Sequence, residues 1–367
     1  MLRNWLQESS YSATEESNLA DWCIGHHLLP SSYSRRTISK AKVAIVGIDS
    51  SFSTLVRKSL YRLAWDFGKL PMLDLGDLRK SDPEFLIPLL RELGAGKIVP
   101  ILIGSSRDRF RAQYQAFQAV QPQVAVAMID QRIRLKAEKS RVAEGFSLNP
   151  AVHNQRQKLY HLSHLAAQRH LNDPALFSLL DSRAYDYLRL GELRQNLQAA
   201  EPIIRDADLL GIDLSAIQLP LAPAQHDPSP AGLLLEEAAQ LSRYGGLSDK
   251  MRSFGVYGFD HIAPEADQLA TADAAAQLIW YFCDGFSSRW GDFPASNKGL
   301  VEYVVDHPSY NNLTFWRSRR SGRWWVQSPA FKHRGEDRHK LVACSQSDYE
   351  LASRGELPER LIAAFSR

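Results

Sequence analysis

Charged and polar residues follow three apolar segments of the sequence, in positions where they could carry chemistry. They are Arg107 and Asp108 after residues 98–104, Asp130, Arg132 and Arg134 after residues 124–129, and Asp213 and Ser215 after residues 207–212. Carboxylates can ligate divalent cations. Arginine has five donors and no lone pair, so it can bind a carboxylate or a phosphate but not a metal. The residue types therefore leave open a metal site, an anion pocket and a closed network of arginine–aspartate ion pairs.

Five short apolar segments read as the strands that must position these residues. They are residues 43–48, 98–103, 124–130, 207–213 and 253–259, and helical patterns such as 54–67 and 83–93 lie between them. Strands that alternate with helices predict a mostly parallel sheet covered on both faces, a three-layer α/β/α fold. Ligands bind at the carboxyl ends of such strands, so residues 49–51, 104–108, 130–134, 213–215 and 258–261 are expected at one edge of the sheet.

The chain divides into an N-terminal arm at residues 1–40, an α/β domain at 41–290 and an aromatic-rich C-terminal extension at 291–367, which we expect to pack on the domain. Residues 317–325 of the extension mix arginines with Trp324 and Trp325. Such a composition can bind RNA or single strands by stacking. A hairpin that turns at residues 321–322 and buries its tryptophans is the simpler interpretation.

The composition indicates a folded protein without a strong electrostatic partner. The 367 residues are 44% hydrophobic and carry a net charge of +3, which gives no reason to expect a nucleic acid or a membrane as partner. The N-terminus turns polar within a few residues, so it does not resemble a secretory signal, and the apolar runs are too short to span a membrane. Three widely spaced cysteines fit a reducing compartment, and we expect a cytoplasmic location.

Several motifs together resemble the ureohydrolase superfamily of arginases, agmatinases and formimidoylglutamases, over residues 40–285. The most specific stretches are GIDLSAIQLPLAP at 211–223, PSPAGL at 228–233, and GVYGFDHIAP at 255–264, which is followed by Thr271 and Ala272. Residues 103–108 and 130–134 stand where the family has its Gly-Gly-Gly-His-Asp and Asp-Ala-His-x-Asp motifs. The resemblance implies the three-layer arginase-like fold. It also implies hydrolysis of a C–N bond in a linear amidine by hydroxide held between two Mn²⁺ ions.

The family's metal ligands, two histidines and four aspartates, are mostly replaced at the matching positions. These positions carry Arg107, Asp130, Arg132, Arg134, Asp213 and Ser215. The six side chains carry a net positive charge in place of the four negative charges that balance two Mn²⁺ ions. The family's acidic residue for the guanidinium of the substrate should fall in 258–261, where Gly258 or His261 takes its place beside Asp260.

Two uses of the three arginines follow. In the first, they fill the place of the metals and pair with Asp108, Asp130 and Asp213 as a closed network. In the second, they bind a small anionic ligand such as a carboxylate or phosphate. Either use predicts a pseudoenzyme without a cofactor that has a binding or assembly role, with a small anion or a protein as partner and with possible homo-oligomers. The alternative is a metal-dependent hydrolase of formimidoylglutamate or a guanidino compound, with Asp130 and Asp213 as the ligands.

Two further segments carry polar residues with a less specific meaning. His161 and His164 form an HxxH pattern that could bind a metal on a helix, although a capped or exposed helix is the simpler expectation. Residues 185–192, YDYLRLGE, are polar, aromatic and charged at once. They could form a surface for a partner or a solvated helix end.

Overall fold

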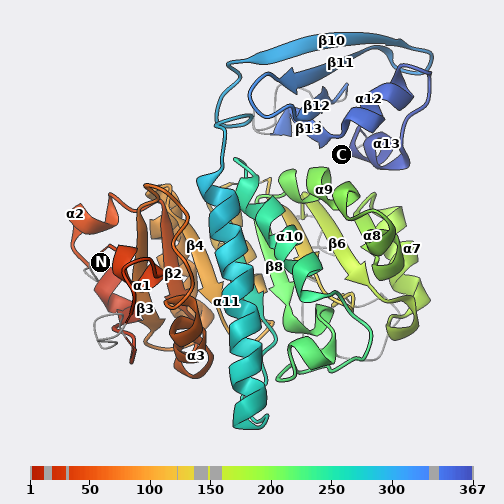
Figure 1. The fold of residues 1–367 in the computed structure, drawn as a ribbon. Helices are drawn as coiled ribbons and strands as arrows, with labels where there is room; N and C mark the ends of the chain where they lie inside the picture. Colours follow the sequence, from red (N-terminus) through yellow and green to blue (C-terminus); the bar gives the residue numbers. More distant parts are fainter. Residues whose placement is uncertain are drawn as a thin grey trace.

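The computed structural model describes residues 2–11, 19–29, 33–121, 123–135, 148, 159–329 and 339–365. A nine-stranded sheet forms the centre of the protein (Figure 1). Its strands are β1 (Leu6–Gln7), β2 (Val43–Gly47), β3 (Met72–Leu78), β4 (Val99–Ile103), β5 (Ala125–Ile129), β6 (His161–Ala167), β7 (Asp186–Arg189), β8 (Leu209–Asp213) and β9 (Ser253–Tyr257). Their order in the sheet is β1-β3-β2-β4-β9-β8-β5-β6-β7.

All neighbouring strands are parallel except the pair of β1 with β3, which is antiparallel. Strands β2, β4, β5, β8 and β9 are buried along their whole length, which explains their uninterrupted apolar sequence. The structure confirms these five predicted strands and the mostly parallel α/β sheet. The N-terminal segment contributes β1 to one edge of this sheet.

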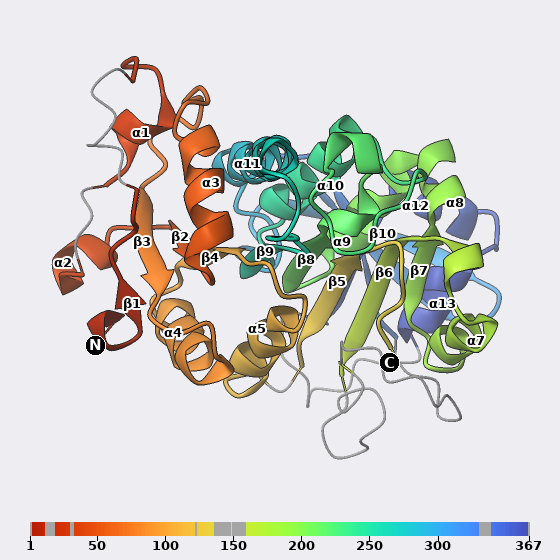
Figure 2. The same cartoon turned by 90° about the horizontal axis from the view of Figure 1, so that it is seen from below.

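Helices cover both faces of the sheet (Figure 2). The longer ones are α3 (Ser50–Leu60), α4 (Pro83–Ala95), α5 (Arg109–Gln118), α7 (Pro174–Ser182), α8 (Leu190–Gln195), α9 (Ala200–Arg205), α10 (Leu235–Leu247) and α11 (Glu265–Ser287). Short elements are α1 (Ile24–His27), α2 (Arg35–Ile38) and the 3₁₀ turns at Leu2–Asn4, Arg169–Leu171, Leu197–Ala199, Leu214–Ala216 and Leu219–Leu221. Helices α3, α9, α10 and α11 share one apolar core with the sheet, and α4, α5 and α7 share a second core on the opposite face.

The predicted helix at residues 54–67 begins and ends earlier than expected. Asp49 caps α3 by accepting a hydrogen bond from the Phe52 amide at 3.4 Å, so the helix begins at Ser50.

The HxxH pattern is not on a helix, and that expectation was wrong. It lies in β6, where His161 and His164 are both buried.

The C-terminal part forms a second, antiparallel sheet in the order β10 (Leu300–His307), β11 (Asn311–Ser318), β12 (Trp324–Gln327) and β13 (Leu341–Cys344). Helices α12 (Gln346–Ala352) and α13 (Glu359–Phe365) follow it. The turn between β11 and β12 contains Gly322 with a φ of +74°, and both Trp324 and Trp325 are buried. The hairpin with buried tryptophans is therefore confirmed.

Arg205, at the end of α9, connects this helix to the second sheet. Its Nη1 donates to the Trp324 carbonyl at 3.1 Å and its Nη2 to the Cys344 carbonyl at 2.9 Å. Its Nε donates to Glu201 at 2.8 Å, and its guanidinium lies 4.5 Å from the centre of the Trp325 ring.

Within the described ranges, we find no helix with the length and apolarity needed to cross a membrane.

Candidate functional site

The carboxyl ends of β4, β5, β8 and β9 bring most of the expected site residues together. Asp213 is the last residue of β8, Asp130 follows β5, and these strands are neighbours in the sheet. The carboxylates of Asp130 and Asp213 and the hydroxyl group of Ser215 are fully buried. Arg107 follows β4 and reaches Asp213 across the intervening strand β9. The site is therefore a buried cluster at the edge where the fold predicts it.

Asp213 is held by three donors. Arg107 Nε lies 2.5 Å from Asp213 Oδ2, and Arg107 Nη2 lies 3.3 Å from Oδ1. The Ser215 amide donates to Oδ1 at 2.9 Å. This two-pronged contact with a guanidinium is the geometry in which arginine binds carboxylates best.

Asp130 is held in a similar way. Arg134 Nε donates to Asp130 Oδ2 at 2.9 Å, and the Arg132 amide donates to Oδ1 at 2.9 Å. The Ser215 hydroxyl donates to the same Oδ1 at 3.0 Å. Ser215 therefore links the two buried aspartates, through its amide on one side and its hydroxyl on the other.

Asp227 completes the cluster, although the sequence interpretation did not include it. Its Oδ2 lies 2.7 Å from Arg107 Nη1 and 2.5 Å from Arg134 Nη2. It comes from the proline-rich loop after β8. The charge balance contains the signal that could have found it: three arginines facing two aspartates need a third carboxylate nearby.

The expected partners of Arg132 and Asp108 were wrong. Arg132 Nη1 donates to the Leu171 carbonyl at 2.9 Å rather than to a carboxylate. Asp108 is exposed at the start of α5, and no ion pair of its side chain is present among the described residues. Asp227 takes the place that we expected for Asp108, because Asp227 Oδ2 contacts both Arg107 and Arg134, whereas Asp108 is exposed at the N-terminus of α5.

Gly258 lies against the cluster, whereas Asp260 and His261 do not. Gly258 has a φ of +89°, and a Cβ atom there would stand 2.5 Å from Asp213 Oδ1. Asp260 Oδ1 accepts a hydrogen bond from the Ile262 amide at 2.9 Å, and His261 is exposed. Gly258 is therefore the residue at this strand end that leaves room for the Asp213–Arg107 pair.

Burial and charge act in opposite directions on the acids of the cluster. Burial, with the nearby Asp213 charge, raises the pKa of Asp130 to about 6, although Arg134 opposes the shift. Partial burial also tends to raise the pKa of Asp227, but the charges of Arg107 and Arg134 lower it overall. Burial would lower the pKa values of Arg107 and Arg134, but their aspartate partners raise both. The arginines therefore remain charged, and the pKa of Asp130 lies closer to neutral pH than that of an ordinary aspartate.

His164 lies behind the cluster in β6. Its Nε2 is 3.1 Å from the Arg132 carbonyl oxygen. Burial is the main cause that lowers its pKa to about 4, so the ring is neutral at pH 7 and Nε2 donates to that carbonyl. His161 contacts Asp186 on β7 at 3.0 Å, so the two histidines of the HxxH pattern have different partners.

The arrangement is suited to holding the strand ends together. Both inner aspartates use their oxygens on guanidinium, amide and hydroxyl donors. Across the parts of the chain with assigned positions, no group of three or more His, Cys, Asp or Glu side chains could hold a metal ion.

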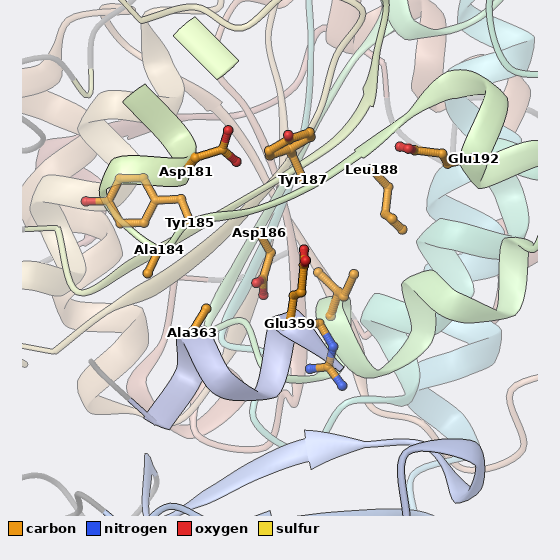
Figure 3. Close-up of a pocket in the computed structure, with 11 residues that line it drawn as sticks. Asp181, Ala184, Tyr185, Asp186, Tyr187, Leu188, Glu192, Glu359 and Ala363 are labelled. Carbon is orange, nitrogen blue, oxygen red and sulfur yellow. The ribbon is translucent and has the colours of Figure 1, made fainter. Parts of the chain in front are cut away.

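Two cavities lie beyond the cluster. One, of about 430 Å³, is at the ends of β6 and β7, and the other, of about 540 Å³, lies between β7 and α13 (Figure 3).

Comparison with solved structures shows that this architecture is the arginase (ureohydrolase) fold. The Trypanosoma cruzi formiminoglutamase with Mn²⁺ is 18% identical, with a TM-score of 0.59, over 71% of this chain and 97% of that one. The agmatine ureohydrolase of Thermoplasma volcanium is 16% identical, with a TM-score of 0.57, over 75% and 97%. The Bacillus subtilis formimidoylglutamase is 15% identical, with a TM-score of 0.58, over 71% and 95%.

No family model matches the sequence, and no curated protein matches it. At these identities the shared property is the fold alone. The function of the chain therefore depends on the residues of its own site.

Proposed function

We propose that this chain is a catalytically inactive protein of the ureohydrolase fold, a pseudoenzyme, that works by binding another protein. One observation carries the proposal. The two aspartates that match the metal ligands of the resembling family are each bound by a guanidinium, and Asp227 joins the two guanidiniums.

The donor set does not fit two Mn²⁺ ions. Manganese requires carboxylate oxygens or imidazole nitrogens with free lone pairs, and a guanidinium offers none. A dication placed beside Asp130 and Asp213 would also meet the positive charges of Arg107 and Arg134. We therefore propose that the protein holds no metal here and carries out no metal-dependent hydrolysis.

A protein partner is favoured over a small anion. An anion pocket needs guanidinium donors that point at the ligand, but Arg107 and Arg134 are already bound to three carboxylates. With Arg132 included, the cluster has equal numbers of positive and negative side chains, so little net attraction for an anion remains.

The three cysteines are free and buried, which supports the proposed cytoplasmic location.

Metal retention tests the proposal directly. The protein is purified without chelator, incubated with excess Mn²⁺, desalted and subjected to elemental analysis, with the Trypanosoma cruzi formiminoglutamase processed in parallel as the positive control. We expect this chain to retain no stoichiometric manganese, and its melting temperature to be the same with and without Mn²⁺. A ligand that binds the native state must raise that temperature.

Two manganese ions per chain with a raised melting temperature would overturn the proposal. That result would favour the alternative, a metal-dependent hydrolase of formimidoylglutamate or a guanidino compound. Asp130→Asn would then abolish both metal retention and turnover.

A further inference from the structure

Strand β10 lies at the outer edge of the second sheet (Figure 1). It is eight residues long and pairs with β11 along its whole length on one side. On the other side, the backbone groups of residues 301–306 have no hydrogen bond with any described residue. The edge of a sheet presents backbone donors and acceptors on which another strand can add. The outer edge of β10 is therefore long and unpaired within the described chain.

The two faces of β10 differ. Val305 belongs to the core that α12 and α13 cover, and Tyr303 packs against the same core. Successive residues of a strand point to opposite faces, so Glu302, Val304 and Asp306 share the other face. All three are exposed, and Val304 is 58% exposed. A strand added to this edge would cover a valine that now lies in solvent.

The exposed charges beside β10 are separated along the strand. Its beginning is basic, because Lys298 precedes it and the Arg319 amide donates to the Gly299 carbonyl at 2.9 Å, which fixes Arg319 beside it. Its end carries Asp306. These three side chains are exposed, and none has an ion pair with a residue of known position. The charges at both ends of β10 therefore remain available to a partner.

This separation of charge makes the edge complementary to itself. Two β10 strands that pair antiparallel about a two-fold axis place the basic beginning of each strand against the acidic end of the other. A parallel pair would place like charges together. The two-fold contact uses the same surface on both chains, so it closes at a dimer. Charge complementarity therefore favours a second copy of this chain as the occupant of the edge.

Glu302 limits the strength of such a contact. It lies near the middle of β10, where the two-fold axis would pass, so the Glu302 side chains of the two copies would approach each other. Like charges that face each other across two strands are destabilising. We therefore expect a reversible equilibrium between monomer and dimer rather than a permanent dimer.

We propose that this protein self-associates through β10, which pairs antiparallel with β10 of a second copy, covers Val304 and joins the two C-terminal sheets into one. The dimer presents every other surface of the chain twice, which raises the avidity for a multivalent partner. This inference goes beyond the proposed function and does not depend on it.

Sedimentation equilibrium of the full-length protein over a range of concentrations tests the proposal. We expect masses between that of one chain and that of two. Asp306→Lys makes the end of β10 basic as well, whereas Lys298→Glu/Arg319→Glu makes its beginning acidic. Either variant places like charges together at both ends of the contact. Each should weaken dimerisation about tenfold, since several exposed charge pairs change from attraction to repulsion.

A mixture of these two variants distinguishes pairing at β10 from a general effect of charge. In the mixed dimer, opposite charges meet again at both ends of the contact, so the mixture should dimerise although neither variant does so alone. Glu92→Lys and Arg91→Glu make similar changes of charge at exposed positions of α4. These controls should leave dimerisation within about twofold of the wild type.

Hydrogen exchange of the β10 amides separates strand pairing from other modes of association. The outward-facing amides of residues 301–306 should be protected in the wild-type dimer and should exchange rapidly in Asp306→Lys. The alternate amides pair with β11, so they should be protected in both proteins. Glu302→Gln should strengthen dimerisation, because it removes the like charges near the axis.

A protein that stays monomeric at every concentration would overturn the proposal. So would a dimer that both charge variants retain, a mixture of the variants that does not associate, or a dimer whose outward β10 amides stay unprotected. Weaker dimerisation of Glu302→Gln would contradict the two-fold arrangement. None of these measurements involves manganese, so their failure leaves the pseudoenzyme proposal standing, whereas retained metal overturns that proposal alone.

Discussion

Arg107 and Arg134 meet on a single carboxylate oxygen. Asp227 Oδ2 lies 2.7 Å from Arg107 Nη1 and 2.5 Å from Arg134 Nη2, while each arginine also binds its own buried aspartate. Asp227 screens the two positive charges from each other, and with 32% of its side chain exposed it is the part of the cluster most open to solvent.

Asp227→Asn should destabilise the protein. The substitution removes the charge that both guanidiniums share, and hydrogen bonds to charged groups contribute about 1.5–3 kcal/mol. We expect the free energy of unfolding in urea at pH 7 to fall by that amount. Asp108→Asn, which removes an exposed carboxylate outside the cluster, is the control and should change it by less than about 0.5 kcal/mol. Equal losses in the two variants would contradict the role of Asp227.

Arg134→Gln should cost more, and its cost should depend on pH. The variant leaves Asp130 buried without its cation, which typically costs about 3–5 kcal/mol. Burial already raises the pKa of Asp130 to about 6 with Arg134 present, and losing Arg134 raises it further. An acid whose pKa is higher in the folded than in the unfolded chain binds its proton more tightly in the native state. This binding stabilises the native state fully below the unfolded pKa of 3.8, and the stabilisation is lost as the pH rises through the folded pKa.

The deficit of Arg134→Gln relative to the wild type should therefore be smaller at pH 5 than at pH 7.5. Urea unfolding at both pH values measures it. Arg243→Gln breaks the partly exposed pair with Asp284 and should cost less than about 1 kcal/mol at either pH. A pH-independent deficit for Arg134→Gln would show that Asp130 does not take up the proton.

Gly258→Ala should destabilise the protein through contact with Asp213. Both Gly258 and Gly322 have positive φ angles, +89° and +74°, so alanine at either position carries a backbone cost of about 1 kcal/mol. At Gly322 a Cβ would meet no atom within 4 Å, whereas at Gly258 it would stand 2.5 Å from Asp213 Oδ1. The difference in unfolding free energy between the two variants isolates this contact, and we expect Gly258→Ala to lose at least about 1 kcal/mol more.

His164 should make the protein less stable in acid. Burial lowers its pKa from 6.5 to about 4, so between these values the unfolded chain binds the proton and the native state does not. The contribution of the neutral ring, up to about 3 kcal/mol, is present above pH 6.5 and is lost as the pH falls to about 4. His164→Gln should flatten the decline in stability over this range, while the exposed His261→Gln should reproduce the wild-type slope.

The sequence predicted the centre of the sheet better than its edges. Strands β2, β4, β5, β8 and β9 are buried on both faces, and this burial requires the apolar runs that identify them. Strands β6 and β7 carry His161, His164 and Asp186, whose polar atoms have partners that only the folded chain provides. Polar residues broke the apolar pattern there, so these two strands were missed.

The resemblance placed several strand-end residues at one site, but it did not identify their partners. Asp130, Asp213 and Ser215 are in contact, as strand-end positions imply. The choice of Asp227 over Asp108 depends on how the loop after β8 folds back, and neither periodicity nor spacing encodes that path. The total charge of the cluster could be estimated from the sequence, whereas the pairing required the structure.

The position of Arg205 has a consequence for how the molecule unfolds. Its buried guanidinium binds carbonyl groups of β12 and β13, so separating the second sheet from the first would leave its two Nη groups and two carbonyl oxygens without these partners. The two sheets should therefore melt in one cooperative transition. The cavity between β7 and α13 has walls from the units of both sheets, so this cooperativity keeps the cavity assembled for as long as the protein is folded.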